Sequence, residues 1–219
     1  MGRRPRFSQS EVEDAALAVV DRAGATGLTM RAVAEELGTG PMTLYTYVED
    51  RAGLDALVVD AVTRRVTLPE HPGEGDWREE VTAIAESVWR AVRDHPHAIP
   101  LVLARRSRSA TFLDVAEALL AALARSGREG SDLLVAFRAV TTFATAFALT
   151  ELAGPVSAAG EDPAEVVERF RALPTDRYPR LVEIAGAARS STPDDEFRRG
   201  LAALLDGLDP VGRGPGPGR

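Results

Sequence analysis

Apolar residues recur at intervals of three and four along almost the whole chain, and no segment shows the apolar–polar alternation of a strand. This periodicity predicts an all-α protein. With 45% apolar residues in 219, such helices can bury a hydrophobic core. Beyond residue 76, we expect helices at about 77–94, 97–106, 109–126, 130–153, 163–172, 178–189 and 194–208.

Capping and turn residues divide the first 66 residues into short helices. Ser8 and Glu11 have the spacing of a capping box, and Gly24 is expected to end the helix that they begin. Asp50 is expected to cap a later helix over about 51–66. The stretch 67–76 is rich in proline and glycine and reads as a linker. The expected domains are therefore 1–66 and 67–208, followed by a disordered Gly/Pro tail at 209–219.

Two short helices joined by a glycine turn lie between these ends, as in a helix-turn-helix. Thr29 is expected to cap the first and Gly38 to end it, and Pro41 suits the first turn of the second. Leu44 and Val48 are four residues apart and are expected to face the core. The spacing predicts an N-terminal three-helix helix-turn-helix domain, with the helix after it leading toward a larger α-helical domain.

The outer face of the second short helix carries hydroxyls and aromatic rings but no charge, which is unusual for a solvated face. Hydroxyl and methyl groups of this kind can meet phosphates and base edges in a major groove. The residues expected to point outward are Met42, Thr43, Thr46 and Tyr47, with Tyr45 at the boundary. Alternatively, Tyr45 and Tyr47 pack against the following helix.

Three segments extend this pattern: 28–38 (LTMRAVAEELG), 41–48 (PMTLYTYV) and 54–57 (LDAL). Together they resemble the TetR family of repressors, specifically over about residues 8–66. The ending FRRGLAALLDGL at 197–208 resembles the tetracycline-repressor type of C-terminal domain more loosely. The resemblance implies an all-α homodimer in which a ligand-binding and dimerisation domain controls release from operator DNA. A dimer is expected to read palindromic double-stranded DNA, and the absence of a recognisable signal peptide or membrane span predicts a cytoplasmic location.

The resemblance also implies residue roles. Thr43, Tyr45 and Tyr47 match recognition-helix positions, and Pro41 and Met42 match base-proximal ones. The second helix meets the DNA backbone in this family, and Arg51 matches a basic position near phosphate. The full set of expected DNA-binding residues is Arg3, Arg4, Arg6, Thr29, Arg31, Pro41, Met42, Thr43, Tyr45, Thr46, Tyr47 and Arg51.

Charge gives the DNA hypothesis little support. The net charge is −7, and residues 1–66 carry eight arginines against ten acidic residues, whereas DNA-binding domains are usually basic. Only the first eight residues, with Arg3, Arg4 and Arg6, are clearly basic. Affinity for DNA would therefore depend on where the charges lie.

The segment 130–153 is apolar nearly all round, so we expect it to be buried on more than one side. One half is expected to line a pocket for a small organic ligand; the alternative is ordinary core. The expected ligand-binding residues are Trp89, Arg105, Phe112, Leu134, Phe137, Arg138, Thr141 and Thr145. Arg138 or Arg105 is expected to pair with an anionic group on a largely apolar ligand.

The other half of this segment carries small residues and is expected to pack across a homodimer. These residues are Ala136, Ala139, Phe143, Ala146 and Thr150. Helix 194–208 is expected to join the interface through a leucine stripe formed by Leu201, Leu204, Leu205 and Leu208.

Metal sites, cofactors and enzymatic activity are not expected. The chain has no cysteine, and a proline separates His95 from His97. The positions of the drug- and metal-binding histidines of the tetracycline repressor correspond to Val66 and Val102. No GxSxG, HExxH or phosphate-binding glycine loop occurs, and neither a signal peptide nor a membrane span is expected. An enzyme and a protein-binding helical adaptor remain the competing hypotheses.

Overall fold

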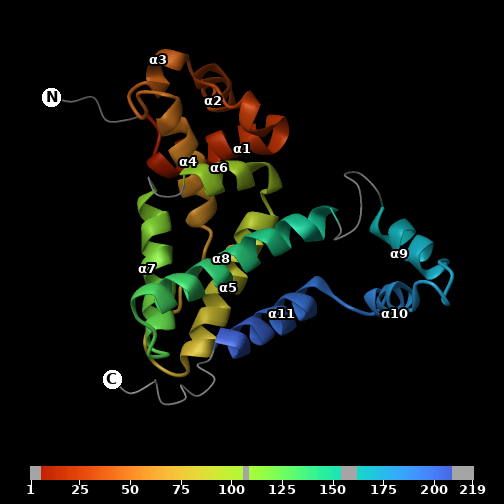
Figure 1. The fold of residues 1–219 in the computed structure, drawn as a ribbon. Helices are drawn as coiled ribbons and strands as arrows, with labels where there is room; N and C mark the ends of the chain where they lie inside the picture. The colour runs from red at the N-terminus through yellow and green to blue at the C-terminus, as the bar shows by residue number, and fades with distance from the viewer. Residues whose placement is uncertain (1–5, 106–108, 154–161, 209–219) are drawn as a thin grey trace.

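In the computed structural model, residues 6–105, 109–153 and 162–208 are described, and every regular element within them is a helix (Figure 1). Four helices form a small bundle at one end of the molecule: α1 Gln9–Gly27, α2 Met30–Glu36, α3 Pro41–Leu44 and α4 Arg51–Thr63. The remaining elements are α5 Trp77–Arg93, the 3₁₀ helix η1 Pro96–Ala98, α6 Ile99–Arg105, α7 Ala110–Ala124, α8 Gly130–Ala153, α9 Pro163–Arg171, α10 Pro179–Ala188 and α11 Pro193–Leu208.

The all-α prediction is confirmed, and the helices predicted beyond residue 76 agree with these bounds to within two residues. Gly24 interrupts the first helix, as predicted, but a short helical segment follows it within α1. Gly24 adopts φ 68° and the helix then continues to Gly27; a left-handed backbone conformation of this kind favours glycine. The helix at 51–66 ends three residues early, at Thr63.

Helix α4 joins the small bundle to the rest of the molecule. It packs against α1 on one side and against α6 and α7 on the other. Its first half supplies Leu54, Leu57 and Val58 to a buried apolar core that continues without interruption to Phe197 and Leu201 in α11. The predicted domain boundary at residue 66 lies just after the end of α4. Because the apolar core is continuous on both sides of that boundary, the division into domains stays a prediction.

An aromatic cluster holds α5, α8 and α11 together. Trp89 is fully buried, and its ring stacks on Phe197 at 4.5 Å between centroids and meets the edge of Phe147 at 5.7 Å. Phe143 lies 5.3 Å from Phe197. Gly200 lets α11 approach α8 closely, since a Cβ at that position would lie 2.7 Å from the Phe143 ring.

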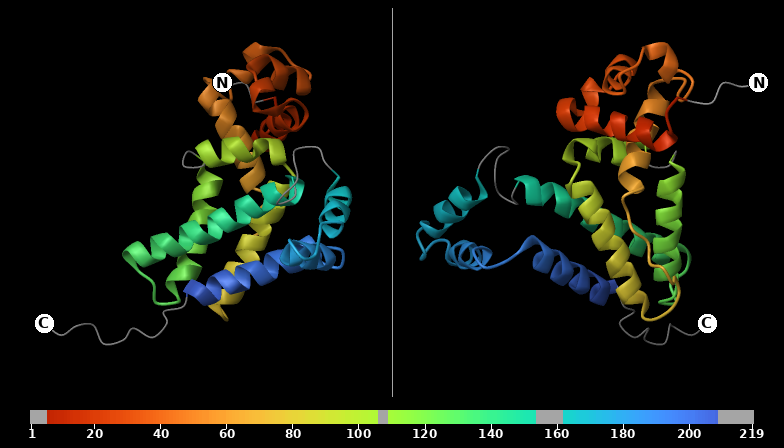
Figure 2. Two further views of the ribbon diagram at one scale, coloured as in Figure 1. Left: turned by 45° about the vertical axis from the view of Figure 1, so that its right-hand side comes forward. Right: turned by 180° about the vertical axis from the view of Figure 1, so that it is seen from behind.

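Helices α9 and α10 pack against each other and extend to one side of the α5–α8–α11 bundle (Figures 1 and 2). Both are short, and Ile184 of α10 is 61% exposed. Most of the described core therefore lies in α1–α8 and α11.

Candidate functional site

The helix-turn-helix forms from local capping interactions. Thr29 Oγ1 accepts a hydrogen bond from the Ala32 amide at 3.1 Å and so begins α2. Gly38 turns the chain with φ 63°, and Pro41 occupies the first turn of α3. Leu44 and Val48 point into the core, as predicted, with exposures of 0% and 7%.

With those two residues buried, the opposite side of α3 faces solvent. Met42 is 78% exposed and Tyr45 51%, and Pro41 and Thr46 are also exposed. The prediction that Met42 and Thr46 point outward is confirmed. The alternative in which Tyr45 packs against α4 is wrong. The result is an uncharged surface of rings, methyl groups and hydroxyls on α3. Helix α3 lies at the tip of the molecule (Figure 1).

Tyr47 is placed differently from the prediction. It is half-buried, and its hydroxyl accepts from the Phe7 amide at 2.8 Å and donates to the Phe7 carbonyl at 3.0 Å. It thereby ties the N-terminal arm to the end of α3. Arg6 on that arm donates to Thr39 Oγ1 at 3.4 Å, which places its charge beside the α2–α3 turn. Arg3 and Arg4 lie outside the described residues.

The other predicted DNA contacts have structural partners in the free protein. Arg31 pairs with Glu35 at 2.8 Å on the surface of α2, and that hydrogen bond and charge raise the pKa of Arg31. Thr43 is half-buried, and its hydroxyl accepts from Thr39 Oγ1. Arg51 donates to the carbonyls of Leu28 and Ala25 and pairs with the Asp55 carboxylate at 2.8 Å. Arg51 thus fixes α4 to the end of α1 and to the loop that follows it.

A small apolar cavity of about 50 Å³ lies between α4, α5, α6, α7 and α8, with Val66 from the segment after α4. That volume holds a few waters but is far below the several hundred Å³ of a pocket for a drug-sized ligand. The lining residues are Val62, Thr63, Val66, Val88, Val92, Val102, Phe112, Val115, Ala116, Leu119, Phe137, Thr141 and Thr145.

Four of the predicted ligand residues line this cavity: Phe112, Phe137, Thr141 and Thr145. Three others do not, and their predicted place at the pocket is corrected. Trp89 belongs to the aromatic cluster, whereas Leu134, 45% exposed, and Arg138 lie on the outer face of α8. Arg105 ends α6, and its side chain is outside the described residues.

Most of the remaining lining residues are valines that sequence reasoning missed, because a valine facing a cavity and a valine in solid core have the same pattern. Val66 and Val102 are the exceptions, since the resemblance had singled out both as drug-site positions. They lie in the cavity wall beside Phe112. Their apolar side chains offer no ligand to a metal ion.

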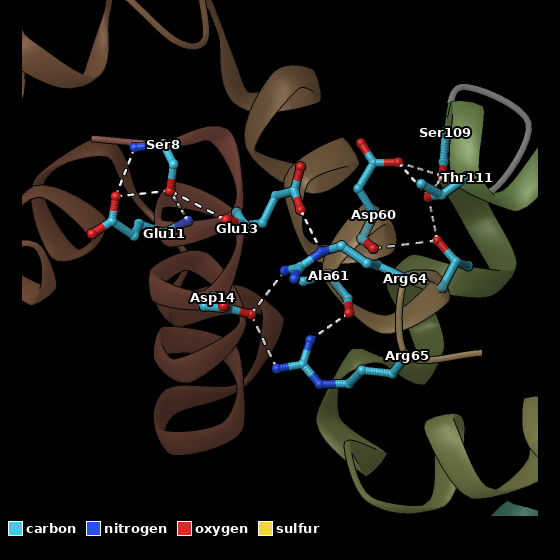
Figure 3. A network of polar contacts seen from close by, with 12 residues as sticks. Ser8, Glu11, Glu13, Asp14, Asp60, Ala61, Arg64, Arg65, Ser109 and Thr111 are labelled. Carbon is cyan, nitrogen blue, oxygen red and sulfur yellow. Dashed lines mark hydrogen bonds and ion pairs between the residues drawn. The ribbon is translucent and has the colours of Figure 1, made fainter. Parts of the chain in front are cut away.

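A polar network surrounds the last turn of α4 (Figure 3), the turn that supplies Val62 and Thr63 to the cavity wall. On one side, the Asp60 carboxylate accepts from Ser109 Oγ at 2.5 Å and from Thr111 Oγ1 at 2.8 Å, both at the start of α7. Thr63, in the cavity wall, lies 2.6 Å from Thr111, oxygen to oxygen. Asp60 and Thr63 could have been noticed in the sequence as polar residues within an apolar helix.

The other side of the same turn is bonded to α1 (Figure 3). Arg64 pairs with Glu13 and with Asp14, each at 3.0 Å, and Arg65 pairs with Asp14 at 3.0 Å. Burial raises the pKa of Glu13, and the positive charge of Arg64 partly offsets that rise. One turn of helix therefore contacts the cavity, α7 and α1 of the small bundle together.

The exposed face of α8 differs from the predicted one. Ala136 is fully buried in the protomer's own core, and Phe143 packs against α11. Of the predicted interface set, Ala146 and Thr150 are exposed, whereas the large apolar residues left exposed are Leu134, Val135 at 59% and Leu149 at 43%. In α11, Leu201 and Leu205 are buried in the same core, at 0% and 1% exposure, so they are not available to a partner chain. Leu204 and Leu208 are partly buried.

Among the described helices, α8 alone is long and apolar enough to cross a membrane, by length and composition only. A core or interface helix of a soluble protein meets the same criterion. Within the described ranges, no group of three or more histidine and acidic side chains could hold a metal ion. His95 and His97 instead contact α1: their Nδ1 atoms lie 2.8 Å from the carboxylate and from the carbonyl oxygen of Asp21.

Comparisons with known proteins agree with this arrangement. Residues 68–211 match the family model for the tetracycline repressor-like C-terminal domain. The chain is 30% identical over 216 residues to the HTH-type transcriptional repressor DrrR1 of Streptomyces coeruleorubidus, covering 95% of this chain and 79% of that protein. It is also 30% identical over 204 residues to the class A tetracycline repressor protein from transposon 1721 of Escherichia coli, covering 93% and 91%.

Solved structures include a similar fold. Apo ActR from Streptomyces coelicolor superposes with a TM-score of 0.74 at 29% identity, over 94% of this chain and 96% of that one. ActR in complex with actinorhodin gives a TM-score of 0.73 at 29% identity, over 92% and 96%. The family model covers residues 68–211, and the repressor relatives and these structures cover more than nine tenths of the chain. The chain therefore belongs to the tetracycline-repressor family of transcriptional regulators.

Proposed function

We propose that this protein is a repressor that binds palindromic operator DNA through α3 and releases it when a small organic molecule enters the cavity. The observation that carries the proposal is the course of α4. Its first half supplies the core beneath the helix-turn-helix, and its last turn supplies Val62 and Thr63 to the cavity wall. A relative, ActR, has been solved with actinorhodin and with (S)-DNPA.

The small volume of the cavity gives the coupling a physical basis. Because its volume is about 50 Å³, a drug-sized ligand has to displace the surrounding helices in order to bind. The last turn of α4 is hydrogen-bonded to α7 through Asp60 and ion-paired to α1 through Arg64 and Arg65. Displacement of that turn would move the bundle that carries α3. A ligand that prefers the displaced state lowers DNA affinity by the same coupling free energy.

A homodimer is part of the proposal, because a single recognition helix contacts too few base pairs to specify one site in a genome. The exposed residues of α8, Val135 and Leu149 among them, are the apolar surface that best supports pairing. Half-sites are expected one helical turn apart, about 34–36 Å, or a multiple of it. Members of this family are soluble regulators and not enzymes. We expect this one to act in the cytoplasm, where its operator lies.

Fluorescence anisotropy with DNA from upstream of the protein's own gene tests the proposal. Tyr45→Ala removes an outward ring and should weaken operator binding by the equivalent of about 1–3 kcal/mol. Tyr178→Ala, the same substitution at the start of α10, is the matched control and should leave affinity unchanged. Equal operator affinity of wild type and Tyr45→Ala would remove α3 as the reading surface.

A further inference from the structure

The polar groups of the cavity restrict the chemistry of its ligand. In the described part of the chain, the lining has three polar side chains, Thr63, Thr141 and Thr145, and the rest are apolar. Each threonine hydroxyl has one proton to donate and two lone pairs with which to accept. The question is therefore where the three protons lie.

Two of the protons are used within α8. Thr141 Oγ1 donates to the Phe137 carbonyl at 2.8 Å, and Thr145 Oγ1 donates to the Thr141 carbonyl at 2.8 Å. These are bonds from a side chain back to its own helix, and they satisfy the donor while leaving the lone pairs of the oxygen unused. Toward a ligand in the cavity, each of these oxygens can therefore act only as an acceptor while its helix bond is kept.

The third proton is used in the network around Asp60. Thr63 Oγ1 lies 2.7 Å from the Val59 carbonyl and 2.6 Å from Thr111 Oγ1. If Thr111 donates to Asp60, Thr63 is free to donate to Thr111 or to Val59. If Thr111 donates to Thr63 instead, Thr63 donates to Val59. In each arrangement the proton of Thr63 is held by the protein.

We propose that the ligand of this cavity is a neutral, largely apolar molecule whose O–H or N–H group donates a hydrogen bond to a threonine oxygen. This inference rests on the proposed function and names its ligand class. A carboxylate or sulfonate would face three threonine oxygens whose protons are already bonded to the protein. A threonine hydroxyl could donate to the anion only by breaking that existing hydrogen bond. Burying a charge without donors is costly. The described lining also lacks a cation, since Arg138 faces outward.

Three probes that share one naphthalene ring system test the proposal by titration calorimetry at pH 7: 2-naphthol, 2-methoxynaphthalene and 2-naphthoate. They present a neutral donor, an acceptor alone and an anion. We expect 2-naphthol to bind about fivefold more tightly than the methyl ether, the equivalent of one net hydrogen bond. We expect 2-naphthoate to bind at least about thirtyfold more weakly than 2-naphthol, for want of a donor.

Threonine-to-valine substitutions locate the acceptor. The preference for 2-naphthol over its methyl ether should fall in Thr63→Val, Thr141→Val or Thr145→Val. It should persist in Thr142→Val, an exposed position on the same helix. The proposal is overturned if wild type shows no preference for 2-naphthol over the ether, if 2-naphthoate binds as tightly as 2-naphthol, or if the preference survives in all three cavity variants.

Operator release, followed separately by anisotropy, distinguishes failure of this inference from failure of the proposed function. If 2-naphthol is preferred at the cavity but no cavity-bound probe lowers operator affinity, the ligand class holds and ligand-controlled release is wrong. If 2-naphthoate binds best and releases DNA, release holds and the neutral-donor ligand is wrong.

Discussion

Replacing Tyr47 with phenylalanine tests how the N-terminal arm is positioned for DNA. The substitution removes one oxygen that bonds both the amide and the carbonyl of Phe7, at 2.8 and 3.0 Å. A net hydrogen bond contributes about 0.5–1.5 kcal/mol. Because Phe7 is only partly buried, water can replace the protein partner, so we expect a loss of about 1–2 kcal/mol in the free energy of unfolding.

The same substitution should also change DNA binding. Arg6 lies on the arm that Tyr47 holds, and Arg3 and Arg4 precede it in the sequence. If releasing the arm removes one arginine–phosphate contact, the slope of log K against log salt falls by about 0.9. Urea unfolding measures the loss of stability. Operator binding at roughly 50 to 200 mM salt, the range where such slopes are measured, gives the change in the salt slope.

Tyr45→Phe is the matched control for stability, because the Tyr45 side chain is exposed and its hydroxyl bonds no described residue. It should unfold at the same urea concentration as wild type. If Tyr47→Phe is as stable as wild type and keeps the full salt slope, the arm is not held by Tyr47 and the reasoning is wrong.

Four further results are expected. Leu201→Ala should cost about 2–5 kcal/mol of unfolding free energy because Leu201 is fully buried within its own protomer; a loss confined to dimer dissociation would contradict this placement. Val135→Arg should give a folded monomer in sedimentation, and a persistent dimer would move the interface away from α8. Arg31→Ala should lower the salt slope of operator binding by about one with little loss of stability, since its surface pair with Glu35 contributes little; an unchanged slope would argue against a phosphate contact. Burial raises the pKa of Glu13. Stability relative to Glu13→Gln should therefore be highest at and below the ordinary carboxyl pKa of about 4.5, and it should fall as pH rises through the shifted pKa. A rise in stability over that pH range in urea unfolding would contradict the burial of Glu13.

The helices and the core of the helix-turn-helix could be predicted because both depend on local signals. The Ser8–Glu11 capping box, the Thr29 cap and the Gly38 turn each form as expected. The pattern that places Leu44 and Val48 inward also places Met42 outward. The exception is Gly24, where the sequence marks an interruption but cannot show whether the helix resumes after it.

The cavity and the face of α8 that packs in the core depend on tertiary contacts. A helix that is apolar nearly all round has no preferred direction, so residue size alone could not show that Ala136 faces the core and Val135 faces solvent. Trp89 has the same sequence pattern whether it stacks on Phe197 or lines a pocket. The hydrogen bond between Tyr47 and Phe7 joins residues 40 positions apart in the sequence, and no local sequence pattern at either residue predicts it.

The separation of the two α3 helices in a dimer is the most direct test of coupling between the cavity and the operator-binding surface. The chain has no cysteine, so Met42→Cys, at a position 78% exposed, admits one spin label per protomer. Electron–electron dipolar spectroscopy of the ligand-free protein should give a distance near one helical turn of DNA, about 34–36 Å, or a multiple of it. Saturation with 2-naphthol should shift that distance. An unchanged distance at saturation, or no dipolar coupling at all, would contradict control of DNA binding by the cavity.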